Sequence, residues 1–422
     1  MSGSYDYSAL DGQLKQRYAK KITRAVPNNR FIQKQVPFSS AELVGDKFNA
    51  PILLSNDSGF TYTDPNGGLT TLNEAVAAQM KNAYLSGSEV IERTAMTYGQ
   101  LARAVAPGAA FENTFDLVMK GMVEATSKRV EIAMLYGQSG VAKAASSANV
   151  SATKTTITVM SAHWAAAIWA GSEGCQLNFY NGSSEISSGA DAVFTVSAVD
   201  SVNKKITVTG TSTGITALDA AIASYPNTVD AFYNGSYGLE MVGLKKILTN
   251  TSSLFGIDAA AYSLWKGNHI TTSGSLTQAK ILDAVATCAN LGLSEDVYVC
   301  VNPKAFNVLS SDQSALRMYD SSYSNGQGTN GFAGLKFHSP SGVVTVVPHM
   351  FVKEGDCFVI NLNDMQRIGA SDITFQTPGK GSAYQMFFQL PSQNGVELRM
   401  YCNQAIMLYR PAQGALLDGF SV

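Results

Sequence analysis

The clearest pattern of apolar positions lies between Phe111 and Tyr136. Residues that can pack together recur there at steps of three and four, which is the spacing of one buried helix face. That face consists of Phe115, Val118, Met119, Met122, Thr126, Val130, Ala133 and Met134. The opposite face carries charges at four-residue steps, namely Asp116, Lys120, Glu124 and Lys128. We therefore predict a helix of about 39 Å that Gly137 brings to an end.

Two extended runs precede this helix, Lys47 to Tyr62 and Glu89 to Tyr98, with a sharp bend between them. The bend consists of Asp64, Pro65, Asn66, Gly67 and Gly68. It is a strong turn signal because proline fixes φ, whereas asparagine and glycine tolerate positive φ. Little continuous apolar surface surrounds it, so we predict a protruding, hairpin-like loop over residues 47–99 that lies on a neighbouring subunit.

Residues 150–229 change to a β pattern. Short runs of strand-forming residues alternate with turn signals at Asn181-Gly182, Ser188-Gly189 and Asp200 to Lys204. The runs are Thr155 to Met160, Cys175 to Tyr180, Val193 to Val199 and Ile206 to Thr209. This pattern predicts a small β sheet or barrel inserted into the main fold.

The rest of the chain combines helices and strands. Ser275 and Gln278 have capping-box spacing before a helix that ends at Gly292, Val297 to Val301 is typical of a buried strand, and Pro303 opens a short helix. A long polar loop is expected from Ser321 to Gly331. Further strands are predicted at Val343 to Val347, Cys357 to Ile360, Tyr384 to Leu390, Val396 to Tyr401 and Ile406 to Tyr409.

The composition favours a protein whose surface is covered by partners. Hydrophobic residues make up 45% and charged residues only 15% of the 422 residues, which leaves few charges to keep a large free monomer soluble. This length exceeds the roughly 250–300 residues of a single hydrophobic core, so we expect more than one lobe. The formal net charge of −2 argues against nucleic-acid binding over the whole surface.

Residues 1–46 form a separate, locally basic arm. Up to position 40 its only acidic residues are Asp6 and Asp11. Its basic residues are Lys15, Arg17, Lys20, Lys21, Arg24, Arg30 and Lys34. The pattern fits either a solvated or subunit-wrapping tail or a segment that contacts an acidic scaffold or packaged nucleic acid.

No motif for catalysis or metal binding is apparent. The histidines His163, His269, His338 and His349 lack metal-ligand spacing. The cysteines Cys175, Cys288, Cys300, Cys357 and Cys402 include no Cys-x-x-Cys pair, which indicates neither a disulfide framework nor a zinc site and favours a reducing compartment. We predict no catalytic, cofactor-binding or metal site. Carboxylates that converge from distant positions would leave no motif, so an enzyme stays open as an alternative.

Targeting and nucleotide-binding patterns are also missing. The N-terminus lacks the basic and apolar stretches of a signal peptide, and no apolar run is long enough for a membrane span. Gly379 to Ser382 is an incomplete phosphate-loop pattern, and Gly137 to Gly140 lacks the spacing of a nucleophile elbow. We expect synthesis in a cytoplasm and no contact with a membrane.

Two parts of the chain carry a family resemblance. Residues 86–93 (Ser-Gly-Ser-Glu-Val-Ile-Glu-Arg) and 98–104 (Tyr-Gly-Gln-Leu-Ala-Arg-Ala) are similar to a strand that returns from an extended loop into a peripheral domain. Residues 237–250 and 256–268 are similar to the start of an axial domain. Together with the order of the elements, they resemble the Hong Kong 97-type fold of tailed-bacteriophage major capsid proteins.

The resemblance implies an α+β, Hong Kong 97-like fold in six parts. They are an N-terminal arm (1–46), an extended loop (47–99), a peripheral domain with its spine helix (100–149), a β-rich insertion (150–229), an axial domain (230–339) and strands that return to the axial and peripheral domains (340–422). The loop tip, Asp64 to Gly68, would contact an adjacent subunit. Covalent Lys–Asn links are not expected, because the tip contains no lysine.

The implied function is a head shell protein that assembles with itself, as hexamers and pentamers, into an icosahedral capsid around a phage genome. The implied partners are a portal protein, a separate scaffolding protein, a cement or decoration protein, and double-stranded DNA held by non-specific contact. Scaffolding is expected as a separate protein, or as a prodomain already removed, because no long acidic helical segment starts the sequence. The alternatives are an encapsulin-like shell, an unrelated α/β enzyme and an exported surface adhesin.

Overall fold

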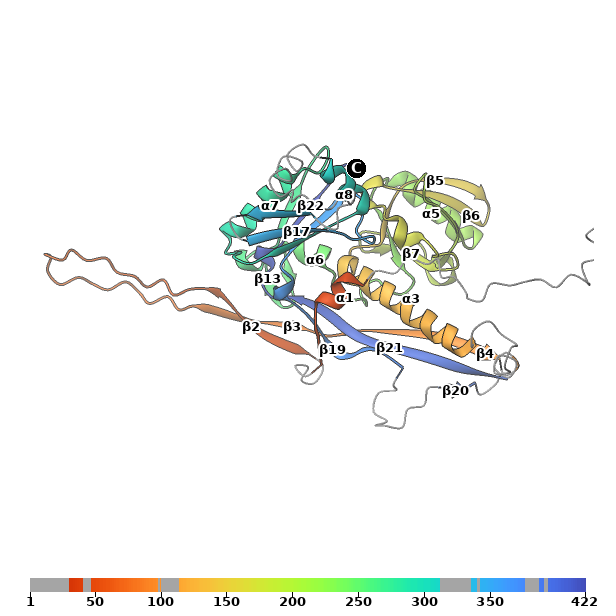
Figure 1. Ribbon diagram of the computed structural model, residues 1–422, viewed down its shortest axis with the longest axis horizontal. Helices are drawn as coiled ribbons and strands as arrows, with labels where there is room; N and C mark the ends of the chain where they lie inside the picture. Colours follow the sequence, from red (N-terminus) through yellow and green to blue (C-terminus); the bar gives the residue numbers. More distant parts are fainter. Residues whose placement is uncertain are drawn as a thin grey trace, which may run out of the picture.

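The computed structural model of the protein describes residues 30–40, 47–97, 99, 114–311, 335–339, 342–375, 387–390 and 394–422. Its longest helix, α3 (Thr114–Tyr136), runs beside a five-stranded sheet (Figure 1). That sheet consists of β1 (Phe38–Ser39), β4 (Ser88–Thr97), β19 (Met365–Thr374), β20 (Phe387–Gln389) and β21 (Gly395–Leu408). Strand β21 lies at its centre, antiparallel to β4 on one side and to β19 and β20 on the other.

The long helix is confirmed, and it ends at Tyr136. Gly137 was expected to end it, but the left-handed residue is the next one. Gln138 takes the left-handed conformation, with φ 58°. Gly137 is needed for close packing, because a Cβ atom there would lie 2.1 Å from the carbonyl oxygen of Met241. The last turn is buried on all sides, and Tyr136 packs edge-on against Phe358 at 5.9 Å between ring centroids. Lys128, expected on an exposed face, is half-buried and donates to the carbonyl of Ala170 at 3.0 Å.

A six-stranded mixed sheet forms the second lobe. Its order is β14 (Asn268–Thr271), β22 (Ala415–Asp418), β18 (Asp356–Ile360), β15 (Val297–Val301), β17 (Gly342–Pro348) and β16 (Leu335–Ser339). Helices α7 (Gln278–Asn290) and α8 (Pro303–Ser310) pack on it. The expected capping box at Ser275 is wrong, because the side chain of Thr277 caps α7. The stop at Gly292 is confirmed, with φ 100°.

The β-rich insertion is a closed antiparallel barrel. Six strands form the ring in the order β11 (Val229–Tyr233), β5 (Ala142–Ser151), β6 (Lys154–Val159), β10 (Lys205–Thr209), β9 (Phe194–Asp200) and β7 (Gln176–Asn181). The ring closes because β11 pairs with both β5 and β7. The short strand β8 (Ser184–Glu185) pairs with the end of β7. Each of the four predicted runs forms a strand. Strands β5 and β11 were not predicted, and they extend the barrel to residues 142–233.

The protruding loop starts from a two-stranded ribbon. Strand β2 (Phe48–Ser55) pairs with β3 (Gln79–Leu85), and residues 56–78 continue outward from them (Figure 1). The expectation that the two extended runs belong to one hairpin is therefore wrong. The second run, β4, pairs over ten residues with β21 instead. Similarly, the two strands expected at Val396 to Tyr401 and Ile406 to Tyr409 are one strand, β21.

The described part of the arm is fixed to the body. In α1 (Phe31–Gln35), the backbone amides of Ile32 and Gln33 donate to the carboxylate of Glu131 at 2.7 and 3.1 Å. His349 Nε2 lies 3.0 Å from the same carboxylate, and both side chains are fully buried. The rest of the arm, residues 1–29 and 41–46, lies outside the described residues. So do the predicted polar loop at Ser321 to Gly331 and residues 384–386 of the strand predicted at Tyr384 to Leu390.

The remaining elements are short connections. They are α4 (Ala166–Trp169), α5 (Ser212–Ser224), α6 (Leu244–Leu248), β12 (Ser253–Leu254), β13 (Ile257–Asp258), and the 3₁₀ turns η2 (Ser161–His163), η3 (Gly189–Ala192), η4 (Ser263–Trp265), η5 (Leu362–Asp364) and η6 (Pro411–Gln413). One large apolar core joins α3, the barrel and the adjacent parts of both sheets. A second core fills the six-stranded sheet beneath α7 and α8. No helix among the described residues is long and apolar enough to cross a membrane.

Candidate assembly surface and adjoining pocket

The protruding loop and its ribbon expose half of the large apolar side chains that the described residues leave exposed. Eight of these sixteen side chains lie between positions 53 and 84. They are Leu53, Phe60, Tyr62, Leu69, Leu72, Val76, Met80 and Tyr84. A run of exposed apolar side chains on one narrow element is typical of a surface that a partner covers.

The base of the loop is anchored, whereas its outer part is open. Phe48, Ala50, Leu54, Ala83 and Leu85 are buried against the body. The amide of Tyr84 also donates to the carbonyl of Phe255 at 2.9 Å. Beyond Ser55 and Gln79 nearly every residue is exposed. The loop therefore projects from a rigid attachment.

The predicted tip forms a local turn. The amide of Gly67 donates to the carbonyl of Asp64 at 3.0 Å, and the amide of Asn66 donates to Asp64 Oδ1 at 2.9 Å. We expected Gly67 and Gly68 to take positive φ angles, but neither does. At Gly67 a side chain would be crowded, because a Cβ atom would lie 3.1 Å from Cβ of Asp64. All five tip residues are exposed.

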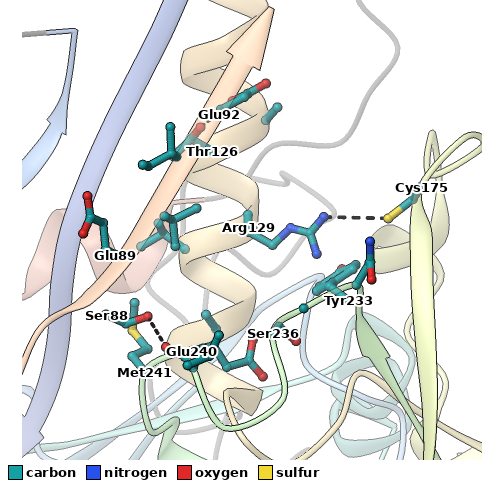
Figure 2. A pocket seen from close by; sticks show the side chains of 18 of the residues that line it. Ser88, Glu89, Glu92, Thr126, Arg129, Cys175, Tyr233, Ser236, Glu240 and Met241 are labelled. Atoms are coloured by element: carbon teal, nitrogen blue, oxygen red, sulfur yellow. Dashed lines mark hydrogen bonds between the residues drawn. The ribbon is translucent and has the colours of Figure 1, made fainter. Parts of the chain in front are cut away.

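A pocket of about 630 Å³ lies between β4, α3 and the segment that follows β11 (Figure 2). The guanidinium of Arg129 lies 3.1 Å from the centroid of the Tyr233 ring, and its Nη2 is 3.7 Å from Cys175 Sγ. Ser236 and Glu240 line the pocket beside them. Sequence reasoning missed this group, because its members come from three segments that share no local motif.

Burial shifts the ionisation of the charged groups around this pocket. It raises the pKa of Glu240 to about 7, although the Gln138 amide and Arg129 act in the opposite direction. It also raises the pKa of Glu92, against a hydrogen bond from Thr126. Burial and the nearby Arg129 lower the pKa of Lys128 to about 8. Charged forms are thus disfavoured here unless a partner compensates them.

The described residues that line the pocket include no histidine. Among the described residues, no group of three His, Cys, Asp or Glu side chains could hold a metal ion. Of the four histidines, His349 is used in the buried contact with Glu131, and His269 Nε2 lies 2.7 Å from Asp418. The side chain of Ser88 donates to the carbonyl of Leu239, so the serine on β4 is not paired with a base.

Comparisons with known proteins address the family. Residues 219–379 match the family described as SU10 major capsid protein. Among solved structures, the chain is similar to one in the capsid asymmetric unit of cyanophage A-1(L), with 9% identity, a TM-score of 0.57 and coverage of 97% of this chain and 98% of that one. It is also similar to one in the capsid of a native GTA particle, with 8% identity, a TM-score of 0.51 and 99% coverage of both chains.

The chain has the fold of tailed-phage major capsid proteins. The resemblance drawn from the sequence is thereby confirmed. The matched family and fold are those of structural capsid proteins, not enzymes. A search of curated proteins found no sequence match.

Proposed function

We propose that this chain is the major capsid protein that forms the icosahedral head shell around a phage genome. The observation that carries this proposal is the loop, whose apolar side chains are left uncovered by the chain itself. Isolated chains rarely expose such a surface, whereas a symmetric shell covers it in every copy with the same interface. The fold and the matched family agree with this function.

In this proposal, the outer part of the loop, residues 56–78, lies across an adjacent subunit, and its tip from Asp64 to Gly68 contacts that subunit. The helix α3 with the five-stranded sheet serves as the peripheral domain, and the six-stranded sheet serves as the axial domain around hexamers and pentamers. The barrel is an insertion beyond the minimal fold. Lysine cross-links at the tip are not expected, because residues 56–78 contain no lysine.

The proposal includes further partners. A portal protein, a separate scaffolding protein and a cement or decoration protein would act with the shell in the bacterial host cytoplasm, and the mature protein would lie in the virion capsid. Lys15, Arg17, Lys20, Lys21 and Arg24 make residues 1–29 basic. Such an arm supports weak, salt-sensitive contact with scaffold or double-stranded DNA without sequence readout.

The test is deletion of residues 60–70, which removes the exposed tip and leaves the ribbon β2–β3 intact. We expect the variant to fold as the wild type does but to form no stable shells under negative-stain electron microscopy. The matched control is Val202→Ser, which changes a side chain that is 88% exposed on a barrel turn. That variant should form normal shells. Normal shells from the deletion would rule out the role of the loop, and packaged cargo in place of DNA would indicate an encapsulin-like compartment.

A further inference from the structure

The pocket between β4 and α3 contains two polar groups without partners. Arg129 Nη1 and Ser236 Oγ are shielded from solvent, and neither has a hydrogen-bond partner among the described residues. Arg129 also forms no ion pair with a described carboxylate. A guanidinium that borders an open pocket fits a carboxylate, because its planar N–H groups match the two carboxylate oxygens.

The carboxyl groups already in the pocket do not fill this position. Glu240 Oε1 accepts the amide of Gln138 at 2.9 Å, and Glu92 Oε2 accepts the hydroxyl of Thr126. Glu89 is exposed and points away from Arg129 (Figure 2). The raised pKa of Glu240, about 7, keeps it partly uncharged near neutral pH, so it opposes a further carboxylate only weakly.

The loop carries side chains that match this pocket. Residues 56–78 contain Asp57, Asp64 and Glu74 but no lysine or arginine. Asp57 already accepts the amide of Ala78, and Asp64 accepts that of Asn66. Glu74 is exposed and has no partner among the described residues. It is therefore the acidic side chain of the loop that is available to bind elsewhere.

Glu74 has an exposed apolar residue two positions away on either side, namely Leu72 and Val76. Leu72 is 77% and Val76 51% exposed. The pocket offers a matching surface, because Ile91 and Leu239 at its rim are 52% and 75% exposed.

The loop of the same copy does not reach this pocket. Figure 1 shows the loop leaving the body on the side away from α3 and the barrel. Hydrogen bonds across the loop, from the amide of Ser58 to the carbonyl of Val76 and from the amide of Asn73 to Thr61 Oγ1, keep its two arms together. If this loop supplies the carboxylate, the carboxylate must therefore come from a second copy.

We propose that Glu74 of one copy binds Arg129 of a second copy, while Leu72 and Val76 cover the apolar rim of the pocket. This inference rests on the proposed shell function and names the contact that the loop makes. A charge-assisted pair at a partly covered site fixes the register of the loop on its neighbour.

The first experiment uses the native Cys175, whose Sγ lies 3.7 Å from Arg129 Nη2. Variants Leu72→Cys and Val76→Cys keep Glu74 and place a thiol beside it. After assembly and treatment with oxidised glutathione, we expect at least one of them to form disulfide-linked oligomers that disappear when Cys175→Ser is added. Val202→Cys is the matched control, because it places an exposed thiol on a barrel turn outside the loop.

The second experiment tests the charge. We expect Glu74→Gln to raise the protein concentration needed for assembly roughly tenfold, whereas Asp283→Asn, which removes the same charge at an exposed position on α7, should have little effect. Glu74→Arg should prevent assembly, and adding Arg129→Glu should restore it. If the wild type forms shells, the absence of a cross-link in both the Leu72→Cys and Val76→Cys variants would overturn this inference alone. Equal assembly of the Gln and Asn variants would do the same. A wild type that never forms shells would overturn the proposed function as well.

Discussion

The six-stranded sheet and the loop over residues 56–78 use apolar side chains in opposite ways. In β15 and β18, Val299, Phe358 and Ile360 are completely buried. In the loop, Phe60 is 71% and Leu72 77% exposed. The same kinds of residue therefore stabilise the chain in one region and remain uncovered in the other. The sheet contributes to the stability of the single chain, and the loop contributes to contact between chains.

The largest expected effect is on stability, from Phe358→Ala. Phe358 is fully buried and packs against Tyr136 at the end of α3. Removing it leaves a cavity where two elements meet, which should lower the free energy of unfolding by about 3–5 kcal/mol. Urea unfolding followed by tryptophan fluorescence measures this change.

The matched change in the loop is Leu69→Ser, at a side chain that is fully exposed. We expect the unfolding free energy of the monomer to stay within about 0.5 kcal/mol of the wild type. A loss comparable to that of Phe358→Ala would break the comparison, because the loop would then contribute to the fold of its own chain.

A pH-dependent effect is expected at Lys353, which is fully buried where α3, the barrel and the six-stranded sheet meet. Its Nζ donates to the carbonyl of Gly140 at 2.9 Å and lies 4.1 Å from the centroid of the Tyr136 ring. Burial, with repulsion from Lys245, lowers the pKa of Lys353 to about 7, against attraction from Asp356 and Asp230. The folded protein thus holds this proton less tightly than the unfolded chain.

The sign of the effect follows from linkage. Between a folded pKa of about 7 and the ordinary lysine value of 10.5, the unfolded chain binds more protons, so stability rises with pH across this window. The variant Lys353→Met lacks this titrating group, so its stability does not rise with pH for this reason. We expect the stability of the wild type relative to this variant to increase by on the order of 3 kcal/mol from about pH 6 to pH 10.

A lysine on the loop ribbon gives the contrasting case. Lys81 is exposed on β3, so Lys81→Met removes a lysine side chain outside any core and is the matched control variant. Unfolding free energies at several pH values measure both variants. Parallel curves for Lys353→Met would show that water reaches the junction and that it is not a buried region like the sheet.

Strong local patterns predicted much of the fold. The helix α3 combines a regular apolar spacing with a glycine at its end, and four barrel strands lie between clear turn signals. Strand β5 was missed because Ala142 to Ser151 is rich in alanine and serine, which have little intrinsic preference for strands. It forms because β6 and β11 supply its hydrogen-bond partners.

The sequence patterns predicted neither the pairing of distant strands nor the pocket. Nothing in the sequence indicates that β3 pairs with β2. Strand β4 pairs with a strand some 300 positions away. Arg129 and Ser236 meet only because the barrel returns the chain to α3. The predicted tip is a local turn and was found for that reason.

The smallest expected effect is a difference in chemical reactivity between Cys175 and the other four cysteines. Cys288, Cys300, Cys357 and Cys402 are buried, and burial raises the pKa of Cys300 to about 12 and those of Cys288 and Cys402 to about 11. Cys175 is half-buried beside the pocket. Since the thiolate reacts and access limits it, iodoacetamide should modify Cys175 first in the native monomer, and mass spectrometry should find the other four only after unfolding.

The rate at which Cys175 is labelled also shows whether assembly covers the pocket. If the loop of a second copy covers the pocket, Cys175 should react at least about tenfold more slowly in shells than in monomers, because the attacking reagent must wait for the loop to leave. Shells of the Glu74→Gln variant, formed at high protein concentration, should recover part of the monomer rate. Equal rates in shells and monomers would mean that the exposed loop is covered somewhere other than at Arg129.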